Sequence, residues 1–112
     1  MAEEQRSSHG HRRGSDRWRP LVRGEGIEYD AFWRALYEAD ADVVLSSDDH
    51  DYERFAPQTP DAKPDPRRGI RQFVVGTGGN NLHRFGKAEP NSEVRKSEFG
   101  VLLLTLHARG YE

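Results

Sequence analysis

The chain has 112 residues, of which 34% are hydrophobic and 32% are charged, and its net charge is −2. These values indicate one small domain or a piece of a larger one, with little apolar material for a core of its own. Because cysteine is absent, disulfides, thiolate metal sites and a cysteine nucleophile are excluded. No apolar run approaches the roughly 18 residues of a membrane span, and residues 1–6 lack the apolar segment of a secretory signal, so we expect neither.

The charges are strongly segregated along the chain. Residues 24–53 hold ten acids against one arginine, which is a net charge of −9. Residues 1–23 and 54–112 carry +3 and +4. An acidic block around one histidine favours a divalent cation over an anionic polymer as a partner. A solvated acidic helix face followed by a loop would explain the same charges, and both interpretations stay open.

Residues 1–26 are rich in arginine, histidine and glycine and show no apolar periodicity, so we expect a flexible segment. His9 and His11 lie among the arginines and could bind phosphate or a metal, although a flexible tail needs no such role. The arginines and Trp18 would permit weak contact with nucleic acid. No nucleic-acid-binding fold is recognisable, so we expect no specific nucleic acid partner.

An amphipathic helix is predicted next in the chain. Its apolar face follows the spacing i, i+3, i+4, i+7 and i+8, and it consists of Tyr29, Phe32, Trp33, Leu36 and Tyr37. The helix should end near Ala39. Asp40 then stands where a left-handed cap residue is expected.

Three strands are predicted after the helix, over residues 42–46, 70–75 and 99–107. Residues 56–69 contain four prolines and should form an irregular surface excursion. The third predicted strand is apolar on both faces, which is typical of an interior strand in a sheet covered on both sides. No helix separates the last two strands, so the predicted class is α/β with a mixed sheet. The pattern resembles half of a domain.

The first predicted strand runs into an acidic turn, Asp48-Asp49-His50-Asp51. Imidazole and carboxylate groups are ligands that zinc, manganese and iron accept. Alternate residues of an extended turn point the same way, so Asp48 and His50 could face one ion while Asp49 turns away. A polar turn with incidental charges is the alternative.

A glycine-rich loop, Gly76-Thr77-Gly78-Gly79-Asn80-Asn81, follows the second predicted strand. Such a loop can bring backbone N–H groups close to an anion. It is not a Walker loop, because no Gly-Lys-Ser/Thr follows it. A plain turn is the simpler interpretation.

Five segments share one resemblance, namely Phe32–Tyr37, Ala41–Ser46, Asp49–Pro57, Gly69–Gly79 and Phe99–Leu102. Together they resemble the C-terminal portion of a bacterial calcineurin-like metallophosphoesterase, in its purple acid phosphatase-like or alkaline phosphatase-like branch. The resemblance covers most of residues 28–107. It implies that residues 27–112 are the C-terminal part of a four-layer α/β/β/α metallophosphoesterase sandwich.

The resemblance also implies an activity, the hydrolysis of phosphate esters with two divalent or trivalent metal ions, for which iron, zinc, manganese and calcium are candidates. In the family both metals bind the phosphate and a bridging hydroxide attacks phosphorus. Full-length relatives are often secreted or periplasmic.

The family's loop after the equivalent strand reads Gly-His-Asp-His, and both histidines bind metal. His50 matches the second histidine, while Asp48 and Ser47 replace the first histidine and the glycine. Residues 7–11 resemble a family stretch that binds phosphate and protonates the leaving group, which makes His11 a candidate catalytic residue and His9 a candidate substrate-binding residue. The family's upstream ligands, two Asp, an Asn in Gly-Asn-His and a further His, have no match in the chain.

Two hypotheses follow. The first is phosphate-ester hydrolysis that is impaired in this chain. The second is a non-catalytic remnant that acts at most as a weak metal-binding or interaction module. Because the helix's apolar face would normally pack on a full sheet, we also expect either a complementing N-terminal half or self-association.

Overall fold

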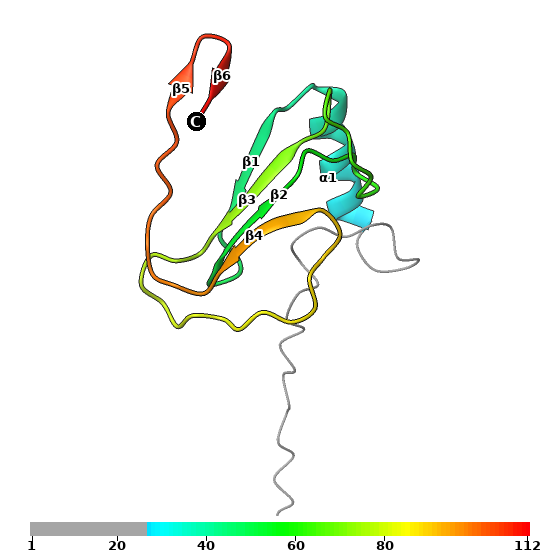
Figure 1. The fold of residues 1–112 in the computed structure, drawn as a ribbon. Coiled ribbons are helices and arrows are strands. Elements are labelled where there is room, and N and C mark those ends of the chain that lie inside the picture. Colours follow the sequence, from blue (N-terminus) through cyan, green and yellow to red (C-terminus); the bar gives the residue numbers. More distant parts are fainter. Residues whose placement is uncertain (1–26) are drawn as a thin grey trace, which may run out of the picture.

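The computed structural model describes residues 27–112, in which one helix precedes two β-sheets (Figure 1). The elements are α1 Ile27–Glu38, β1 Val43–Ser46, β2 Tyr52–Phe55, β3 Arg71–Val75, β4 Ser92–Lys96, β5 Leu106–His107 and β6 Gly110–Tyr111. Within this described part, no helix is long and apolar enough to cross a membrane. The segment predicted to be flexible, residues 1–26, lies outside the described residues, and so do His9 and His11.

The larger sheet has four strands in the order β1-β3-β2-β4. Its interior strand β3 pairs in parallel with β1 and antiparallel with β2, and β2 pairs antiparallel with β4. The prediction of an α/β fold with a mixed sheet is therefore confirmed. The parallel pair matters for the site, because β1 and β3 end at the same edge of the sheet.

Helix α1 ends as its sequence predicts. Asp40 has φ of 55°, which is the left-handed conformation. Its N–H donates to the Tyr37 carbonyl at 3.1 Å, and the Ala41 N–H donates to the Leu36 carbonyl at 3.0 Å. This pair of bonds is the Schellman arrangement, which satisfies carbonyls that the end of a helix otherwise leaves without a donor.

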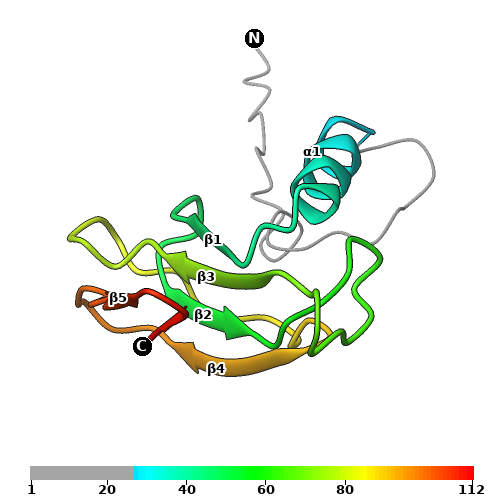
Figure 2. The same cartoon turned by 90° about the horizontal axis from the view of Figure 1, so that it is seen from above.

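Helix α1 covers one face of the four-stranded sheet, while residues 99–112 run along the other (Figures 1 and 2). Trp33, 7% exposed, and Ile70, fully buried, form the cluster that joins helix and sheet. Partly buried residues pack around this cluster, namely Leu36, Tyr37, Val44 and Ala62. Phe32, which was predicted on the apolar face, is 55% exposed.

The irregular excursion between β2 and β3 attaches the helix by polar contacts. The Tyr37 hydroxyl donates to Asp65 at 2.7 Å, and the Arg68 guanidinium lies 2.9 Å from the Asp40 carboxylate. The backbone N–H of Arg68 and then the Tyr37 hydroxyl hold the pKa of Asp65 below its usual value. The excursion therefore covers the end of α1.

The prediction of a third strand over residues 99–107 is wrong for most of its length. Only Leu106–His107 is a strand, in a hairpin with Gly110–Tyr111. Val101 and Leu103 are 93% and 85% exposed. An apolar segment forms a strand only beside a neighbour that offers backbone hydrogen-bond partners. Within the described residues this segment runs along the face of the sheet without entering it (Figure 1).

Strands β2 and β4 were not predicted, because charged residues interrupt their apolar pattern. In β2 the buried positions are Glu53 and Phe55, so a carboxylate occupies a place where an apolar residue is expected. That carboxylate accepts a hydrogen bond from the hydroxyl of Ser92 on β4. A partner across the sheet thus makes the buried acid tolerable.

Candidate metal-ligand loop

Two loops meet at the edge where β1 and β3 end. Residues 47–51 connect β1 to β2, and the glycine-rich loop begins at Gly76, directly after β3. Because β1 and β3 are parallel, with Ser46 beside Val74, both loops leave the same edge. Loops at the carboxyl ends of parallel strands are the usual place for ligand binding in α/β sheets.

Gly76 brings these loops into direct contact. A Cβ placed on it would lie 2.7 Å from the Asp49 carbonyl carbon, closer still to the carbonyl oxygen, and 3.0 Å from the His50 Cα. The Gly76 N–H also donates to the Asp51 carbonyl at 2.9 Å. Only a residue without a side chain permits this approach. Gly76 therefore determines how closely residues 47–51, the turn that contains His50, pack against the end of β3.

The His50 ring is held by the second half of the glycine-rich loop. Its Nδ1 lies 2.8 Å from the Asn81 carbonyl oxygen, which can only accept, so Nδ1 carries the proton of the neutral ring. The lone pair of the neutral imidazole is then on Nε2. The amide nitrogen of Asn80 lies 3.5 Å from this Nε2, while its oxygen accepts from the Asn81 N–H at 2.8 Å.

A second histidine, His83, completes the arrangement, and no motif in the sequence indicated it. The His83 N–H donates to the His50 carbonyl at 2.8 Å, and the His50 N–H donates to His83 Nδ1 at 3.1 Å. The two imidazoles stack with centroids 4.2 Å apart and planes 21° apart. The Asp49 carboxylate lies 3.5 Å from His83 Nδ1. The signal that could have indicated His83 was its place in the loop after β3.

The predicted ligands differ in their surroundings. His50 is partly buried and fixed, whereas Asp48 is exposed. Asp49, which was expected to turn away from an ion bound by Asp48 and His50, lies partly buried with its carboxylate 3.5 Å from His83 Nδ1. Among residues 27–112, no group of three or more histidine or carboxylate side chains is arranged to hold a metal ion. The described donor set thus fits one ligand position and not a two-metal centre by itself, and metal binding by His50 and Asp48 stays a prediction.

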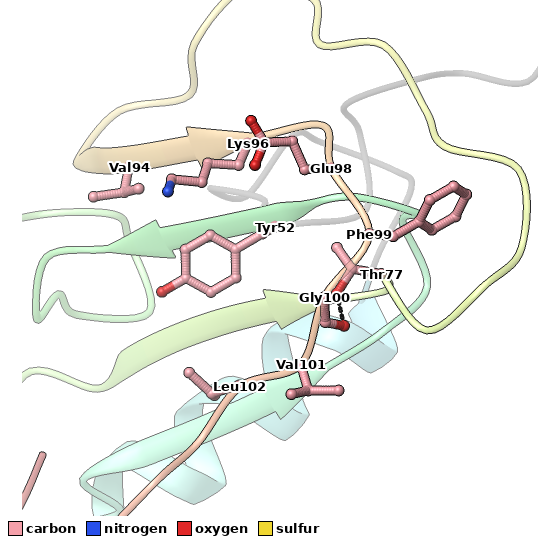
Figure 3. A pocket seen from close by; sticks show the side chains of 9 residues that line it. All are labelled: Tyr52, Thr77, Val94, Lys96, Glu98, Phe99, Gly100, Val101 and Leu102. Carbon is pink, nitrogen blue, oxygen red and sulfur yellow. Dashed lines mark hydrogen bonds between the residues drawn. The ribbon is translucent and has the colours of Figure 1, made fainter.

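A cavity of about 430 Å³ lies on the sheet face opposite α1, beneath residues 98–102 (Figure 3). Tyr52, Lys96 and Phe99 are among its lining residues, and His50 is not. The Thr77 hydroxyl donates to the Gly100 carbonyl at 2.8 Å, and the Gly100 N–H donates back to the Thr77 carbonyl at 3.1 Å. These two bonds tie the C-terminal segment to the glycine-rich loop.

One curated protein with significant similarity is purple acid phosphatase 21 of Arabidopsis thaliana, which is 42% identical over 82 residues. The match supports a metallophosphoesterase-like relationship. It covers 69% of this chain and spans 18% of the relative's own length. No family model matches the chain, and no solved structure matches it.

Proposed function

We propose that the chain contributes a metal-ligand loop to metal-dependent hydrolysis of phosphate esters, with Nε2 of His50 as the ligand atom. One observation carries the proposal, the bond between His50 Nδ1 and the Asn81 carbonyl. Histidines that bind metals commonly donate their other ring N–H to a carbonyl or carboxylate, which fixes the tautomer and the ring orientation. The similarity to a purple acid phosphatase supplies the class of reaction.

Metal ions in such a centre would polarise the phosphate and supply a hydroxide nucleophile at neutral pH. Of the described residues, His50 fits a ligand position and Asp48 is a second candidate that stands exposed on the same turn. His11 and His9 remain the candidates for leaving-group protonation and phosphate binding. Because residues 27–112 hold no group of three candidate ligands, we expect the isolated chain to be impaired. A non-catalytic, weakly metal-binding module is the alternative that this same observation favours.

Zinc binding and turnover test the proposal together. We expect the purified chain to bind Zn²⁺ weakly in titration calorimetry, with affinity at least about 10-fold lower after His50→Ala, because one ligand is lost. His107→Ala is the matched control, since His107 is exposed and pairs with Glu112 in the terminal hairpin. Asp48→His should tighten binding about 10-fold or more, because it adds a second imidazole beside His50.

The same variants are then assayed on a chromogenic phosphomonoester with Mn²⁺ or Zn²⁺. We expect no measurable turnover from the isolated chain. Turnover that His50→Ala abolishes would refute the non-catalytic alternative. Equal zinc affinity in the wild type and His50→Ala would refute the ligand role of His50.

We further propose that the chain takes its place in a four-layer α/β/β/α sandwich, with another layer over the face opposite α1. Supporting this, Val101 and Leu103, in the segment that runs along that face (Figure 1), are 93% and 85% exposed, and Leu45 on β1 is 56% exposed. The covering layer would be a complementing N-terminal half, and the isolated chain would bury the surface by self-association instead.

Self-association of the isolated chain is expected to depend on residues 101–103. Val101→Thr combined with Leu103→Thr places polar side chains of equal or smaller size where the apolar ones are almost fully exposed. Analytical ultracentrifugation should show larger species for the wild type and a shift towards monomer for the double variant. A wild-type chain that sediments as a monomer at all concentrations would contradict the expectation.

A further inference from the structure

We propose that His83 is a positioning residue for His50, and that it holds the His50 backbone and ring so that Nε2 presents its lone pair outward. The claim that His83 fixes the position of His50 rests on contacts between described residues. The purpose of this positioning, metal binding by His50, rests on the proposed function.

The first step is the backbone. Both polar backbone groups of His50 are bonded to the same residue, its carbonyl to the His83 N–H at 2.8 Å and its N–H to His83 Nδ1 at 3.1 Å. Two bonds from one residue fix the orientation of the peptide groups on either side of the His50 Cα. They leave the side chain as the only part of His50 that can turn.

The second step is the ring. The His83 imidazole stacks on that of His50 at 4.2 Å, and a stacked neighbour limits rotation about the side-chain bonds. Rotation would also break the bond from His50 Nδ1 to the Asn81 carbonyl. Because Asn81 and His83 belong to one loop, a single segment sets the backbone, the ring orientation and the tautomer of His50.

The third step is the protonation pattern. His83 Nδ1 lies 3.1 Å from the backbone N–H of His50, which can only donate, and 3.5 Å from the Asp49 carboxylate, which can only accept. The shorter contact is the hydrogen bond, so we assign Nδ1 of the neutral ring as the acceptor and Nε2 as the protonated nitrogen. The two stacked rings are therefore opposite tautomers. His83 has its protonated Nε2 available to donate, and His50 has its lone pair on Nε2. Of the pair, only His50 has an unprotonated ring nitrogen that is not bonded to the backbone, and the neighbour of this Nε2 is the Asn80 amide nitrogen at 3.5 Å. This makes His50 the candidate ligand and His83 its support.

Two substitutions test separately the two contributions of His83, the hydrogen bond accepted by Nδ1 and the stacking of its ring on His50. His83→Asn places an amide oxygen near the position of Nδ1 and removes the ring. His83→Phe keeps an aromatic ring for stacking and removes the acceptor. His107→Asn, in the distant hairpin, is the control. The strand amides of β1 and β3 in a ¹⁵N correlation spectrum report that each variant keeps the fold.

The primary readout is the His50 tautomer in the metal-free chain, measured from imidazole ¹⁵N shifts with ¹⁵N-labelled histidine. Spectra are taken at one pH of about 8.5, well above the ordinary histidine pKa of ~6.5. We expect wild type and His107→Asn to show His50 with its proton on Nδ1, and both His83 variants to show a mixture of tautomers. An unchanged tautomer in both His83 variants, with unchanged strand amides, would overturn the proposal.

Zinc titration is the second readout. Loss of support around a metal-binding histidine costs about 10- to 100-fold in affinity, so we expect a loss in that range for His83→Phe and a smaller one for His83→Asn. A tautomer that depends on His83 in a chain that binds no Zn²⁺ would overturn the proposed function and leave the positioning role intact. Zinc binding that requires His50 and ignores both His83 variants would overturn the positioning role alone.

Discussion

Replacing Gly76 with alanine is expected to lower the free energy of unfolding by about 2–4 kcal/mol, because the new methyl group overlaps backbone atoms that cannot move aside as a side chain could. The overlapping atoms are the carbonyl group of Asp49 and the Cα of His50. Urea unfolding followed by circular dichroism measures the change. Both chains in this comparison also carry Val101→Thr and Leu103→Thr, so that self-association does not affect the measured stability.

Gly78→Ala is the matched control for this substitution. Gly78 lies two residues further along the same loop, a Cβ on it meets no atom within 4 Å, and its φ is outside the left-handed region. Its effect should stay within about 0.5 kcal/mol. Equal destabilisation by the two substitutions would show that the close approach of Gly76 to the His50 turn is not what matters.

Gly76→Ala should also affect His50. Because the clash falls on the Asp49–His50 backbone, the turn must rise from the sheet edge and strain the bonds that His50 makes to Asn81 and His83. We therefore expect the molecules of the Gly76→Ala variant that remain folded to show a mixture of His50 tautomers, as we expect for the His83 variants. Gly78→Ala should retain the wild-type tautomer.

Trp33→Ala is expected to cost about 3–5 kcal/mol of stability, which is the range for deleting a large buried aromatic side chain. Trp33 and Ile70 form the cluster that joins α1 to the sheet. In a domain with so few buried apolar residues, such a loss is comparable to the whole stability of a small protein. Thermal unfolding followed by far-UV circular dichroism should show a lower midpoint for Trp33→Ala than for the parent chain.

The neighbouring residue offers the control. Phe32 is also aromatic and lies on the same helix, but it is 55% exposed. Phe32→Ala should cost less than about 1 kcal/mol. A similar loss from both substitutions would mean that aromatic content of the helix, and not burial against Ile70, stabilises the fold.

Local features of the fold were predictable. The cap at Asp40 and the strands that begin near Val43 and Arg71 appear in the structure within a residue or two of the predicted positions. Each depends on a short stretch, either an apolar run bounded by turn residues or the backbone preference at a helix end. The irregular excursion between β2 and β3 was equally readable from its prolines.

Pairing between distant segments was not predictable from the same signals. Strand β2 contains the buried Glu53, which accepts a hydrogen bond from Ser92 on β4. Residues 99–107, which are apolar on both faces, suggested an interior strand, yet residues 99–105 cross the sheet face with Val101 and Leu103 exposed. A strand forms only where a neighbour offers backbone partners, and a single segment carries no information on its neighbour.

The candidate site, like the fold, has features that the sequence indicates and features that depend on tertiary pairing. The acidic turn that holds His50 is visible in the sequence, since it follows a short apolar run and contains imidazole and carboxylate groups that metals accept. His83 and Gly76 were not visible, because their roles depend on β1 and β3 being parallel neighbours that end at one edge of the sheet. The sequence by itself determined the helix, two of the strands and the identity of the candidate ligand. Only the tertiary structure decided what holds that ligand, because the His50 backbone and ring are bonded by residues 81 and 83, which only the pairing of β1 with β3 brings to its side.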